Sequence, residues 1–493
     1  MVRTADAVSA PAPRPPRGSC VCCARPPGAD RPEPSSDTSG PSDTAPPTAV
    51  TDPVDVVSAT CAGGLDNVLL ATCAVDLATP SAVSVTLESG DLAVRFTSEA
   101  VAAHHEIPVW GLRAEAEWAY IASAGGRTEQ GTFTTGALPE AIAGVRAAVT
   151  GNAAGLAQVV LPAECERRAH LVALDARGDI RWYHYFAGAT GERMSLKNFQ
   201  WTSQQTVLGM SQLELAEFDL LGNEVWRLPE ADLPMHHDVF RSGELRYVLQ
   251  ADTWVESDGV LYVEDLVTAY DATGTQVFRW LEHDHLDARG QSTVGSATWG
   301  DEFPGALDAW HTNALWVEPN GDFVLSLKQP NVLLRVTAAD GELAWVIDGD
   351  GTGDAIPHTI DFVGGGDPGF DDQHNVQLHP DGTLALVDNG HVGDMRGLEL
   401  TLDVAAGTVA LQSEWPVPDL DCPTQSSLFP LPNGGRLLTC TEDHVVVELD
   451  STGVEVWRAT LTCPPEGELP PTVRGYPVDL WSMRVGDVVA TGL

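Results

Sequence analysis

The sequence predicts an all-β protein, a six-bladed β-propeller preceded by a small immunoglobulin- or fibronectin-like β-sandwich. Two observations indicate the propeller: a turn motif that occurs six times, and histidines at matching positions of three extended segments. A third indicates the sandwich, since a Gly-Leu turn, a Trp/Tyr strand and a closing Thr-Phe-Thr-Thr resemble the last strands of such a domain.

The turn motif places a Gly four residues before a large apolar residue. Its copies are DARGDIRW, DLLGNEVW, DATGTQVF, AADGELAW, VAAGTVAL and DSTGVEVW. Four of the six have Asp three residues before the Gly, which is typical of a type I turn between antiparallel strands. The alternation beyond each Gly, as in Glu224-Val225-Trp226, indicates a strand with one buried face.

The spacing of the copies indicates radial repetition, because blades of propellers have about 40 to 50 residues each. Two longer intervals, 281–310 and 346–373, are expected to form loops over the mouth of the central channel. A sandwich of many hairpins without radial symmetry is the alternative fold.

Histidines stand where three extended runs begin. The segments are MHHDV (235–239), WHTNA (310–314) and QHNV (373–376), and the runs end in turns at Gly243, Gly321 and Gly382. A fourth segment, QSSLFPLPNGG, has Ser426 in the place of His374. Matching positions of radially arranged strands converge on one axis, so these histidines are expected to share one cavity.

Composition divides the chain into three parts. Pro, Ser, Thr, Asp and Gly dominate the region before residue 54, so 1–53 is expected to be a disordered tether. The sandwich is assigned to 54–140 and the propeller to 150–493, the catalytic domain. The sequence does not determine the oligomeric state, and a homodimer is compatible with it.

The net charge is −43, from 27 basic and 70 acidic residues, which argues against binding to nucleic acid or to an anionic membrane. No segment is long and apolar enough to span a membrane. Against this background the only two lysines, Lys197 and Lys328, are conspicuous. Lys328 ends the strand that begins at His311 and is assigned to the cavity, whereas the place of Lys197 is attributed to chance.

The nine cysteines indicate an oxidising, extracytoplasmic compartment, the periplasm or the outer cell surface. Cys61 with Cys73, and two of Cys422, Cys440 and Cys463, are expected to form disulfides. Their spacing does not match a structural zinc site. Residues 1–18 show no export signal, so we expect a start further upstream, with a lipid-modified cysteine near Cys20.

The residues around the histidines suit an anion better than a metal ion. A metal would need mainly neutral imidazoles with a carboxylate or water, and an ammonium group nearby repels a cation. Lysine and imidazolium hold anionic oxygens, the amides of Asn313 and Asn375 donate neutral hydrogen bonds, and one unprotonated imidazole remains as nucleophile. Calcium binding by Asp348, Asp350 and Asp354 of DGDGTGD is an alternative use of that loop, although the glutamate of a calcium loop is missing.

The segments MHHDV, WHTNALWVEPNGDFVLSLKQPN, LLRVTAADGELAWVIDGDG and FDDQHNVQLHPDGTLALVDNG resemble the bacterial arylsulfate sulfotransferase family. The resemblance is good over about 230–390 and weak in the sandwich. It implies an N-terminal β-sandwich, a six-bladed propeller, and transfer of a sulfuryl group between phenols in ping-pong fashion through a sulfohistidine. Small-molecule phenols and aryl sulfates are the implied partners, and no cofactor is implied.

The resemblance also implies roles for individual residues. His374 matches the sulfurylated histidine, and His311 with Asn313 matches the family's oxyanion-binding pair. His237 matches the remaining cavity histidine better than His236 does, and is expected to protonate or orient the leaving oxygen. Lys328 stands where the family leads us to expect Arg, and Lys cannot form a bidentate fork with a sulfuryl group. The alternative function is a non-catalytic cell-surface propeller that binds an anionic ligand or a partner protein.

Overall fold

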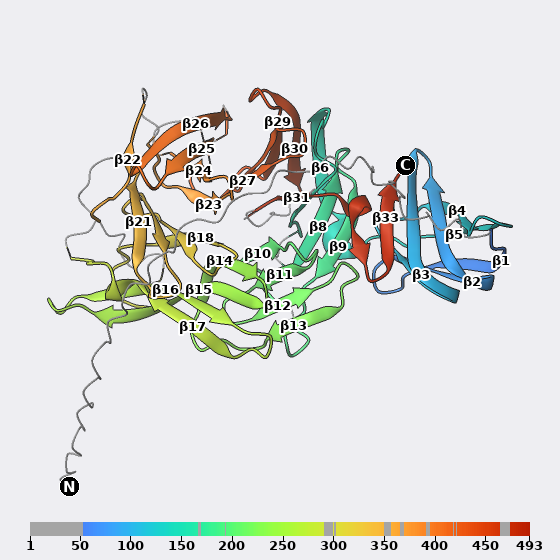
Figure 1. The fold of residues 1–493 in the computed structure, drawn as a ribbon, viewed down its shortest axis with the longest axis horizontal. Coiled ribbons are helices and arrows are strands. Elements are labelled where there is room, and N and C mark those ends of the chain that lie inside the picture. The colour runs from blue at the N-terminus through green and yellow to red at the C-terminus, as the bar shows by residue number, and fades with distance from the viewer. Residues whose placement is uncertain are drawn as a thin grey trace, which may run out of the picture. The chain divides into compact units, whose positions relative to one another are not determined.

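The computed structural model describes residues 53–493 except 166–168, 193, 290–298, 300–301, 350–355, 365–368, 391–394, 418, 421 and 464–473. Almost all of the regular structure is β. The described residues contain one short helix, α1 (Glu140–Ala143), and two short 3-10 helices, η1 (Glu282–Asp284) and η2 (Leu480–Ser482). Their strands form seven sheets (Figure 1), which confirms the predicted all-β class.

Six of these sheets are the blades of a propeller, numbered here by the order of their innermost strands around the ring. Blade 1 contains β31 (Tyr476–Val478), β7 (Gln158–Pro162), β8 (His170–Asp175) and β9 (Ile180–Tyr185). Blade 2 contains β10 (Asn198–Trp201), β11 (Val207–Met210), β12 (Leu215–Phe218) and β13 (Glu224–Leu228). Blade 3 contains β14 (Met235–Ser242), β15 (Leu245–Val255), β16 (Leu261–Tyr270) and β17 (Gln276–Leu281).

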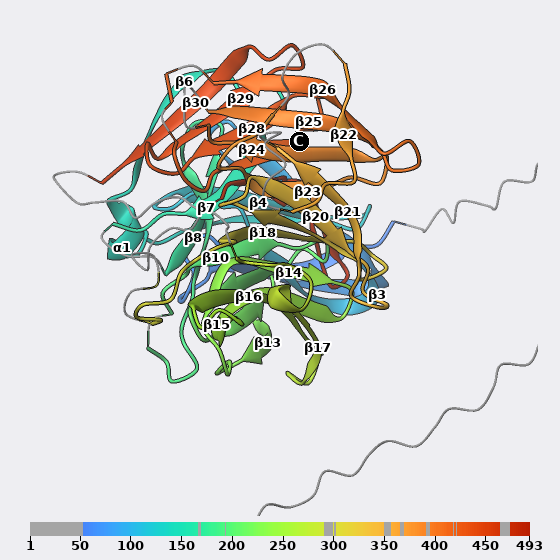
Figure 2. The same cartoon turned by 90° about the vertical axis from the view of Figure 1, so that its left-hand side faces the viewer.

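The other three blades follow in chain order. Blade 4 contains β18 (Thr312–Val317), β19 (Phe323–Leu327), β20 (Val332–Val336) and β21 (Leu343–Asp348). Blade 5 contains β23 (His374–Leu378), β24 (Thr383–Asp388), β25 (Arg396–Asp403) and β26 (Thr408–Pro416), with β22 (Asp361–Phe362) at its edge. Blade 6 contains β27 (Ser427–Pro430), β28 (Arg436–Cys440), β29 (Val445–Leu449) and β30 (Glu455–Thr462), with β6 (Arg146–Gly151) outside. In the view turned by 90°, β13 and β17 lie at one end of the propeller and β26 and β30 at the other (Figure 2).

Two strand exchanges close the ring. The late strand β31 is the innermost strand of blade 1 and pairs with β7, whereas the early strand β6 is the outermost strand of blade 6 and pairs with β30. Both ends of the propeller are therefore held by backbone hydrogen bonds, because each end completes a sheet made by the other. The predicted six-bladed propeller is confirmed.

The repeated turn motif has a structural reason. In each Asp-containing copy the Gly donates its N–H to the carbonyl of the Asp three residues earlier, at 2.8 to 3.0 Å, and the Gly has a positive φ of 78 to 85°. The tryptophan then donates its indole N–H to the matching turn of the next blade, as Trp182 does to Leu220 at 2.8 Å and Trp457 to Ala176 at 2.8 Å. In blade 3 this donor is Trp280, two residues beyond Phe278, and its acceptor is Gly341. In blades 1, 2, 3 and 6 a tryptophan at or near the motif therefore joins the blade to the next one.

The innermost strands are joined by a second ring of hydrogen bonds, here called the inner ring. It passes from β10 through β14, β18, β23 and β27 to β31 and back to β10. Its members are Asn198 to the carbonyl of His237, Leu315 N–H to Asp238 (2.8 Å), Asn313 to the carbonyl of Gln373 (2.8 Å), Leu428 N–H to Asn375 (3.0 Å), Gly475 N–H to Ser427 (3.2 Å) and Tyr476 to the carbonyl of Phe199 (3.3 Å). Most of these bonds use a side chain at the start of an innermost strand, so the ring fixes those residues around one axis.

The seventh sheet contains the N-terminal strands β1 (Val56–Gly63), β2 (Ala71–Ser89), β3 (Leu92–Val109), β4 (Glu117–Ser123) and β5 (Glu129–Thr134). The chain's last strands, β32 (Arg484–Val485) and β33 (Val488–Gly492), join the same sheet through pairing of β33 with β3. The sequence did not indicate this return, because its only signal is a short alternating stretch after the last motif. The division into the two facing sheets of a sandwich stays a prediction.

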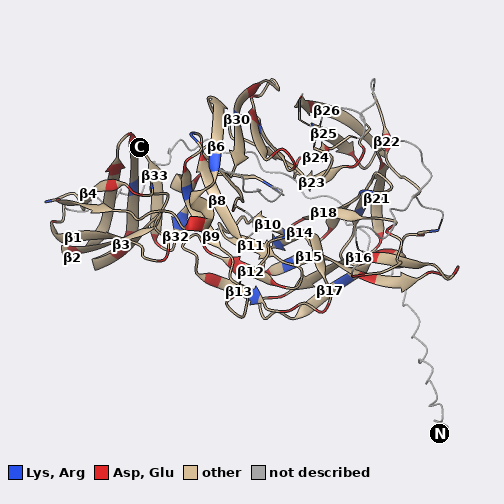
Figure 3. Ribbon diagram, turned by 180° about the vertical axis from the view of Figure 1, so that it is seen from behind, with Lys and Arg blue, Asp and Glu red and all other residues tan. Residues whose placement is uncertain are grey.

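Three disulfides connect described cysteines. Cys61 pairs with Cys73, as the sequence predicted, and Cys422 with Cys440, one of the three pairings that the sequence left open. Cys463 pairs with Cys165, which the sequence did not indicate. The last pair joins residues near β30 of blade 6 and β7 of blade 1, so it reinforces the closure of the ring. Acidic residues are distributed over the blades and the N-terminal sheet (Figure 3). In the described part of the chain, no helix is long and apolar enough to cross a membrane.

The disulfides should differ in their contributions to stability, because the loops that they close differ in length. Cys165 and Cys463 are 298 residues apart in the sequence, whereas Cys61 and Cys73 are 12 apart. Loop-closure entropy predicts about 3 kcal/mol for a loop of about 15 residues and about 5 kcal/mol for one of 100 or more. We expect the double Ser variant at 165 and 463 to lower Tm in calorimetry more than the double Ser variant at 61 and 73. A larger loss of Tm in the variant at 61 and 73 would contradict the argument from loop length.

Candidate active site

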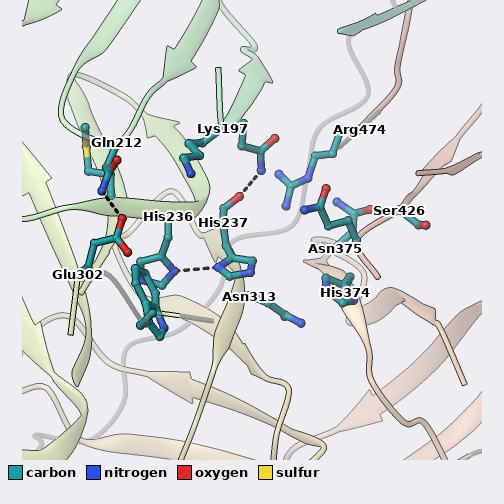
Figure 4. Close-up of a pocket in the computed structure, with 14 residues that line it drawn as sticks. Lys197, Gln212, His236, His237, Glu302, Asn313, His374, Asn375, Ser426 and Arg474 are labelled. Carbon is teal, nitrogen blue, oxygen red and sulfur yellow. Dashed lines mark hydrogen bonds between the residues drawn. The ribbon is translucent and has the colours of Figure 1, made fainter. Parts of the chain in front are cut away.

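A cavity of about 250 Å³ lies where the innermost strands begin. Residues from blades 2 to 6, and Arg474 just before β31, line it. They are Lys197, Asn198, Gln212, Met235, His236, His237, Trp299, Glu302, Asn313, His374, Asn375, Gln425, Ser426 and Arg474. Figure 4 shows them arranged around one space. Residues predicted from three separate segments, namely His236, His237, Asn313, His374 and Asn375, are therefore brought together.

A second cavity of about 1210 Å³ is lined by residues further along the same innermost strands, among them Trp201, Phe240 and Trp316. Asn375 and Arg474 line both cavities. These two side chains therefore lie between the cavities.

The residues that begin the innermost strands have an unusual backbone conformation. His237, His311, Asn375 and Ser426 have φ angles of 49, 50, 54 and 79°. The strand pairing shifts register between His236 and Val239 in β14, between Thr312 and Ala314 in β18, and between His374 and Gln377 in β23. A bulge of this kind redirects a side chain at the end of a strand, and left-handed conformations of residues other than Gly cost about 1–3 kcal/mol each. The repeated histidine pattern thus marks a repeated bulge at the start of the innermost strand.

His374 is held in one tautomer. Its Nδ1 lies 2.7 Å from Oδ1 of Asn389 and 2.9 Å from the carbonyl oxygen of Asp372. The Asn389 amide nitrogen donates to the carbonyls of Cys422 and Gln425, so its oxygen must face the imidazole. Since both neighbours of Nδ1 are acceptors, Nδ1 carries the proton and Nε2 has a free lone pair. Burial, with a smaller contribution from the charge of Lys328, lowers the pKa of His374 to about 3.

His236 and His237 form a pair. Their Nδ1 atoms are 2.9 Å apart, and the Nε2 atom of His236 lies 3.3 Å from Oδ1 of the buried Asp265. Burial lowers the pKa of His236 to about 4, and burial together with the neighbouring histidines lowers that of His237 well below its usual value. Burial therefore favours the neutral form of both rings.

His311 lies behind this pair, outside the set of lining residues. Its ring contacts that of His237 edge to face, with centroids 4.8 Å apart. Its Nδ1 is 2.6 Å from Oδ2 of the buried Asp308, whose Oδ1 accepts the His311 backbone N–H at 3.0 Å. Asp308 therefore fixes both the backbone and the ring of His311.

Lys328 also lies outside the set of lining residues. Its Nζ is 2.9 Å from Oδ1 of Asp372, which is two residues before His374. The backbone N–H of Lys328 donates to the carbonyl of His311 at 3.2 Å. Lys328 is therefore close enough to affect His374 and His237 electrostatically, but its charge is shared with a carboxylate.

Two cations that the sequence did not assign to the site line the cavity, Lys197 and Arg474. Arg474 is buried and forms a bidentate pair with Asp238, at 2.7 and 2.6 Å. That carboxylate raises the pKa of Arg474. The sequence signal was weak, since Arg474 lies outside every repeat. The first three strands of blade 1 in chain order, β7 to β9, lack an innermost partner, so a C-terminal segment must supply that strand. A search for this segment would have led to Arg474, directly before β31.

The amides of the site have distinct tasks. Asn313 donates to the carbonyl of Gln373, and Oδ1 of Asn375 accepts from Gln377 (2.9 Å) and from the Leu428 N–H (3.0 Å). With both its acceptor positions used, Asn375 can offer its amide N–H groups to a ligand. Of the proposed calcium ligands only Asp348 belongs to the described residues, since Asp350 and Asp354 lie outside them.

The arrangement defines a class of protein: a β-propeller with neutral imidazoles, amide donors and cations around a small cavity, suited to a tetrahedral oxyanion and a nitrogen nucleophile. A scan against family models matches Arylsulfotransferase (ASST) over residues 147–404, just over half of the chain. The chain belongs to the arylsulfotransferase family. This membership supports aryl sulfotransferase activity in general.

Comparison with solved structures finds other proteins at low similarity. A protein of unknown function from Bacteroides caccae is 13% identical, with a TM-score of 0.37, over 64% of this chain and 97% of that one. The Cps50 (Swd1) β-propeller domain of Myceliophteria thermophila is 10% identical, with a TM-score of 0.36, over 65% and 90%. A catalytically inactive virginiamycin B lyase from Staphylococcus aureus is 10% identical, with a TM-score of 0.36, over 64% and 99%. These likenesses support no functional argument, and a search of curated proteins found no match.

The pair of Asp238 and Arg474 should be essential to the stability of the site. Breaking a buried ion pair by removing one partner costs about 3–5 kcal/mol, because the other charge stays buried without compensation. We expect Arg474→Met to lower the free energy of unfolding by this amount in urea titrations. The double variant Asp238→Asn with Arg474→Met should recover part of the loss. A double variant less stable than Arg474→Met would contradict this account.

Proposed function

We propose that the protein transfers a sulfuryl group from a phenolic sulfate ester to an acceptor phenol through a sulfohistidine at His374. The tautomer of His374 is the observation that carries this proposal. Asn389 and the Asp372 carbonyl hold the proton on Nδ1, so that Nε2 is an unprotonated nucleophile in a cavity with amide donors and cations. Family membership supports the substrate class.

In the first half-reaction, Nε2 of His374 attacks sulfur while the bond from sulfur to the phenolic oxygen breaks. The phenolate leaves with the bonding electrons, and His237 protonates it. Such transfers have loose transition states, so positioning and electrostatic stabilisation supply most of the rate enhancement. The second half-reaction reverses these steps with the acceptor phenol. The route requires no cofactor, since the transferred group passes directly between histidine and phenols.

Charge on the transferred group is stabilised from several sides. Asn313 and Asn375 lie in the cavity as amide donors, and Arg474 and Lys197 line it as cations. Lys328 and His311 lie outside the lining residues, each in contact with a carboxylate, Asp372 and Asp308, and contribute at longer range. Because Lys328 is paired with Asp372, it supplies less charge than a free cation would.

The disulfides are compatible with an extracytoplasmic site of action. We propose that the protein acts in the periplasm or at the cell surface on small phenols and aryl sulfates that reach it there.

Replacement of the nucleophile tests the proposal directly. His374→Ala should abolish turnover of 4-nitrophenyl sulfate with phenol, because no other group can form the covalent intermediate. Mass spectrometry of the wild type, quenched without acceptor, should show one added sulfuryl group on the peptide that contains His374. His358→Ala is the matched control, because His358 is exposed and lies outside the cavity. Unchanged activity in His374→Ala would remove the nucleophile assignment, and absence of any transfer by the wild type would favour the non-catalytic binding propeller.

The low pKa of His374 predicts how the first half-reaction depends on pH. Since burial lowers this pKa to about 3, the ring is protonated only as the pH falls through about 3. Formation of the adduct should therefore keep its rate between pH 7 and pH 5. A histidine with the ordinary pKa of about 6.5 would be about 76% neutral at pH 7 but only about 3% neutral at pH 5, and the rate would fall about 25-fold. Single-turnover measurements of adduct formation between pH 7 and pH 5 check this prediction. A rate that falls with pH would contradict the low pKa of His374.

A further inference from the structure

We propose that Asp265, His236 and His237 form a relay that moves one proton between a buried carboxyl group and the cavity. The relay makes His237 an acid in the first half-reaction and a base in the second. This inference rests on the proposed function and identifies the residues that supply and take up the proton.

The three side chains form a continuous line from the core to the cavity. His237 and His236 line the cavity, and their Nδ1 atoms are 2.9 Å apart. Beyond them, Nε2 of His236 is 3.3 Å from Oδ1 of Asp265, which is 1% exposed. The other carboxyl oxygen of Asp265 accepts the backbone N–H of Thr312 at 2.7 Å, which fixes the group with Oδ1 towards His236.

The two facing atoms are unpaired in the structure. Within the described part of the chain, neither Nε2 of His236 nor Oδ1 of Asp265 has a hydrogen-bond partner, so the 3.3 Å contact between them is not itself a hydrogen bond. The ring of His236 also interacts with the backbone of Gln250. Buried polar atoms are almost always paired, because an unpaired one costs about 1–3 kcal/mol. A small movement that turns the 3.3 Å contact into a hydrogen bond would give both atoms a partner.

The geometry couples the three protonation sites. Only one of the two facing Nδ1 atoms can carry a proton when both rings are neutral. If Asp265 is protonated and donates to Nε2 of His236, then Nδ1 of His236 donates to His237, whose Nε2 must carry a hydrogen. If Asp265 is ionised, His236 donates from Nε2 and accepts at Nδ1. His237 then donates from Nδ1, and its Nε2 is bare.

These two states match the two half-reactions. As the phenolate leaves sulfur, His237 gives it the Nε2 proton and receives the Nδ1 proton of His236, which takes the proton of Asp265. Asp265 ends as a carboxylate and both rings stay neutral. The acceptor phenol then loses its proton to Nε2 of His237 as its oxygen attacks the sulfohistidine, and the protons return to Asp265. One proton leaves with the first phenol and one enters with the second, so the cycle balances.

The surroundings favour a protonated Asp265 in the resting protein. Burial, followed by the charge of Asp308, raises the pKa of Asp265 well above its usual value. Asp265 is also near Glu264 and Glu282. His236 is near His311, Asp308 and Lys197. His237 is near His311, His374 and Lys328. Burial keeps a second proton off either ring, since it lowers the pKa of both.

Two donors with different leaving groups test the relay. Phenolate needs protonation as it leaves, whereas 4-nitrophenolate needs little, so Asp265→Asn should slow the first half-reaction of phenyl sulfate about 100-fold and that of 4-nitrophenyl sulfate less than about tenfold. Glu264→Gln is the matched control, because it removes a neighbouring buried carboxylate whose contact is with His283. An equal loss with both donors, or the same pattern in Glu264→Gln, would overturn the relay.

A measurement on the wild type needs neither turnover nor a variant. Nitrogen-15 NMR of labelled histidines distinguishes protonated from bare ring nitrogens, and the relay requires His236 and His237 to exchange tautomers together as rising pH ionises Asp265. Rings that keep their tautomers, or change them at different pH values, would overturn the relay even if sulfuryl transfer occurs. A joint change in a protein that transfers no sulfuryl group would support the relay and contradict the proposed function instead.

Discussion

The inner ring is the constraint on which the rest of the site depends. Each innermost strand is joined to the next by a hydrogen bond near its start, and the last of them returns from Tyr476 to Phe199. A closed ring cannot shift one strand without stretching the bonds on both sides. His237, His311 and Asn375 have a left-handed backbone conformation, which costs about 1–3 kcal/mol for each residue. They keep it because the hydrogen bonds of the inner ring offset this conformational cost.

Burial of the imidazoles is a direct consequence of this closure. The innermost strands bring His236, His237 and His374 to the axis, away from water, where the neutral form is favoured. The proposed mechanism needs an unprotonated nucleophile and a protonated acid at the same pH. Tautomers can meet both needs without charged rings, because Asn389 fixes the proton of His374 on Nδ1 while the facing Nδ1 atoms of His236 and His237 can share one proton.

Cations beside neutral imidazoles would be costly if they had no partners. Lys328 is paired with Asp372 and Arg474 with Asp238, so most of the positive charge near the cavity is balanced. A chain of net charge −43 would otherwise repel an anionic sulfate ester. Neutral amide and imidazole N–H donors, with Lys197 on the cavity wall, are therefore left to hold an oxyanion in an acidic protein.

The sequence by itself determined the number of blades, the position of the histidines at the start of innermost strands, and the disulfide between Cys61 and Cys73. It could do so because repeats, turns and cysteine spacing are local, and radial repetition converts matching positions into neighbours. Only the tertiary structure decided that Arg474 enters the cavity and that Lys328 turns to Asp372. It alone also decided that Asp265 stands behind His236 and that the last strand returns to β3. Those contacts join segments up to hundreds of residues apart, and no local pattern encodes which side chain reaches the axis when the ring closes.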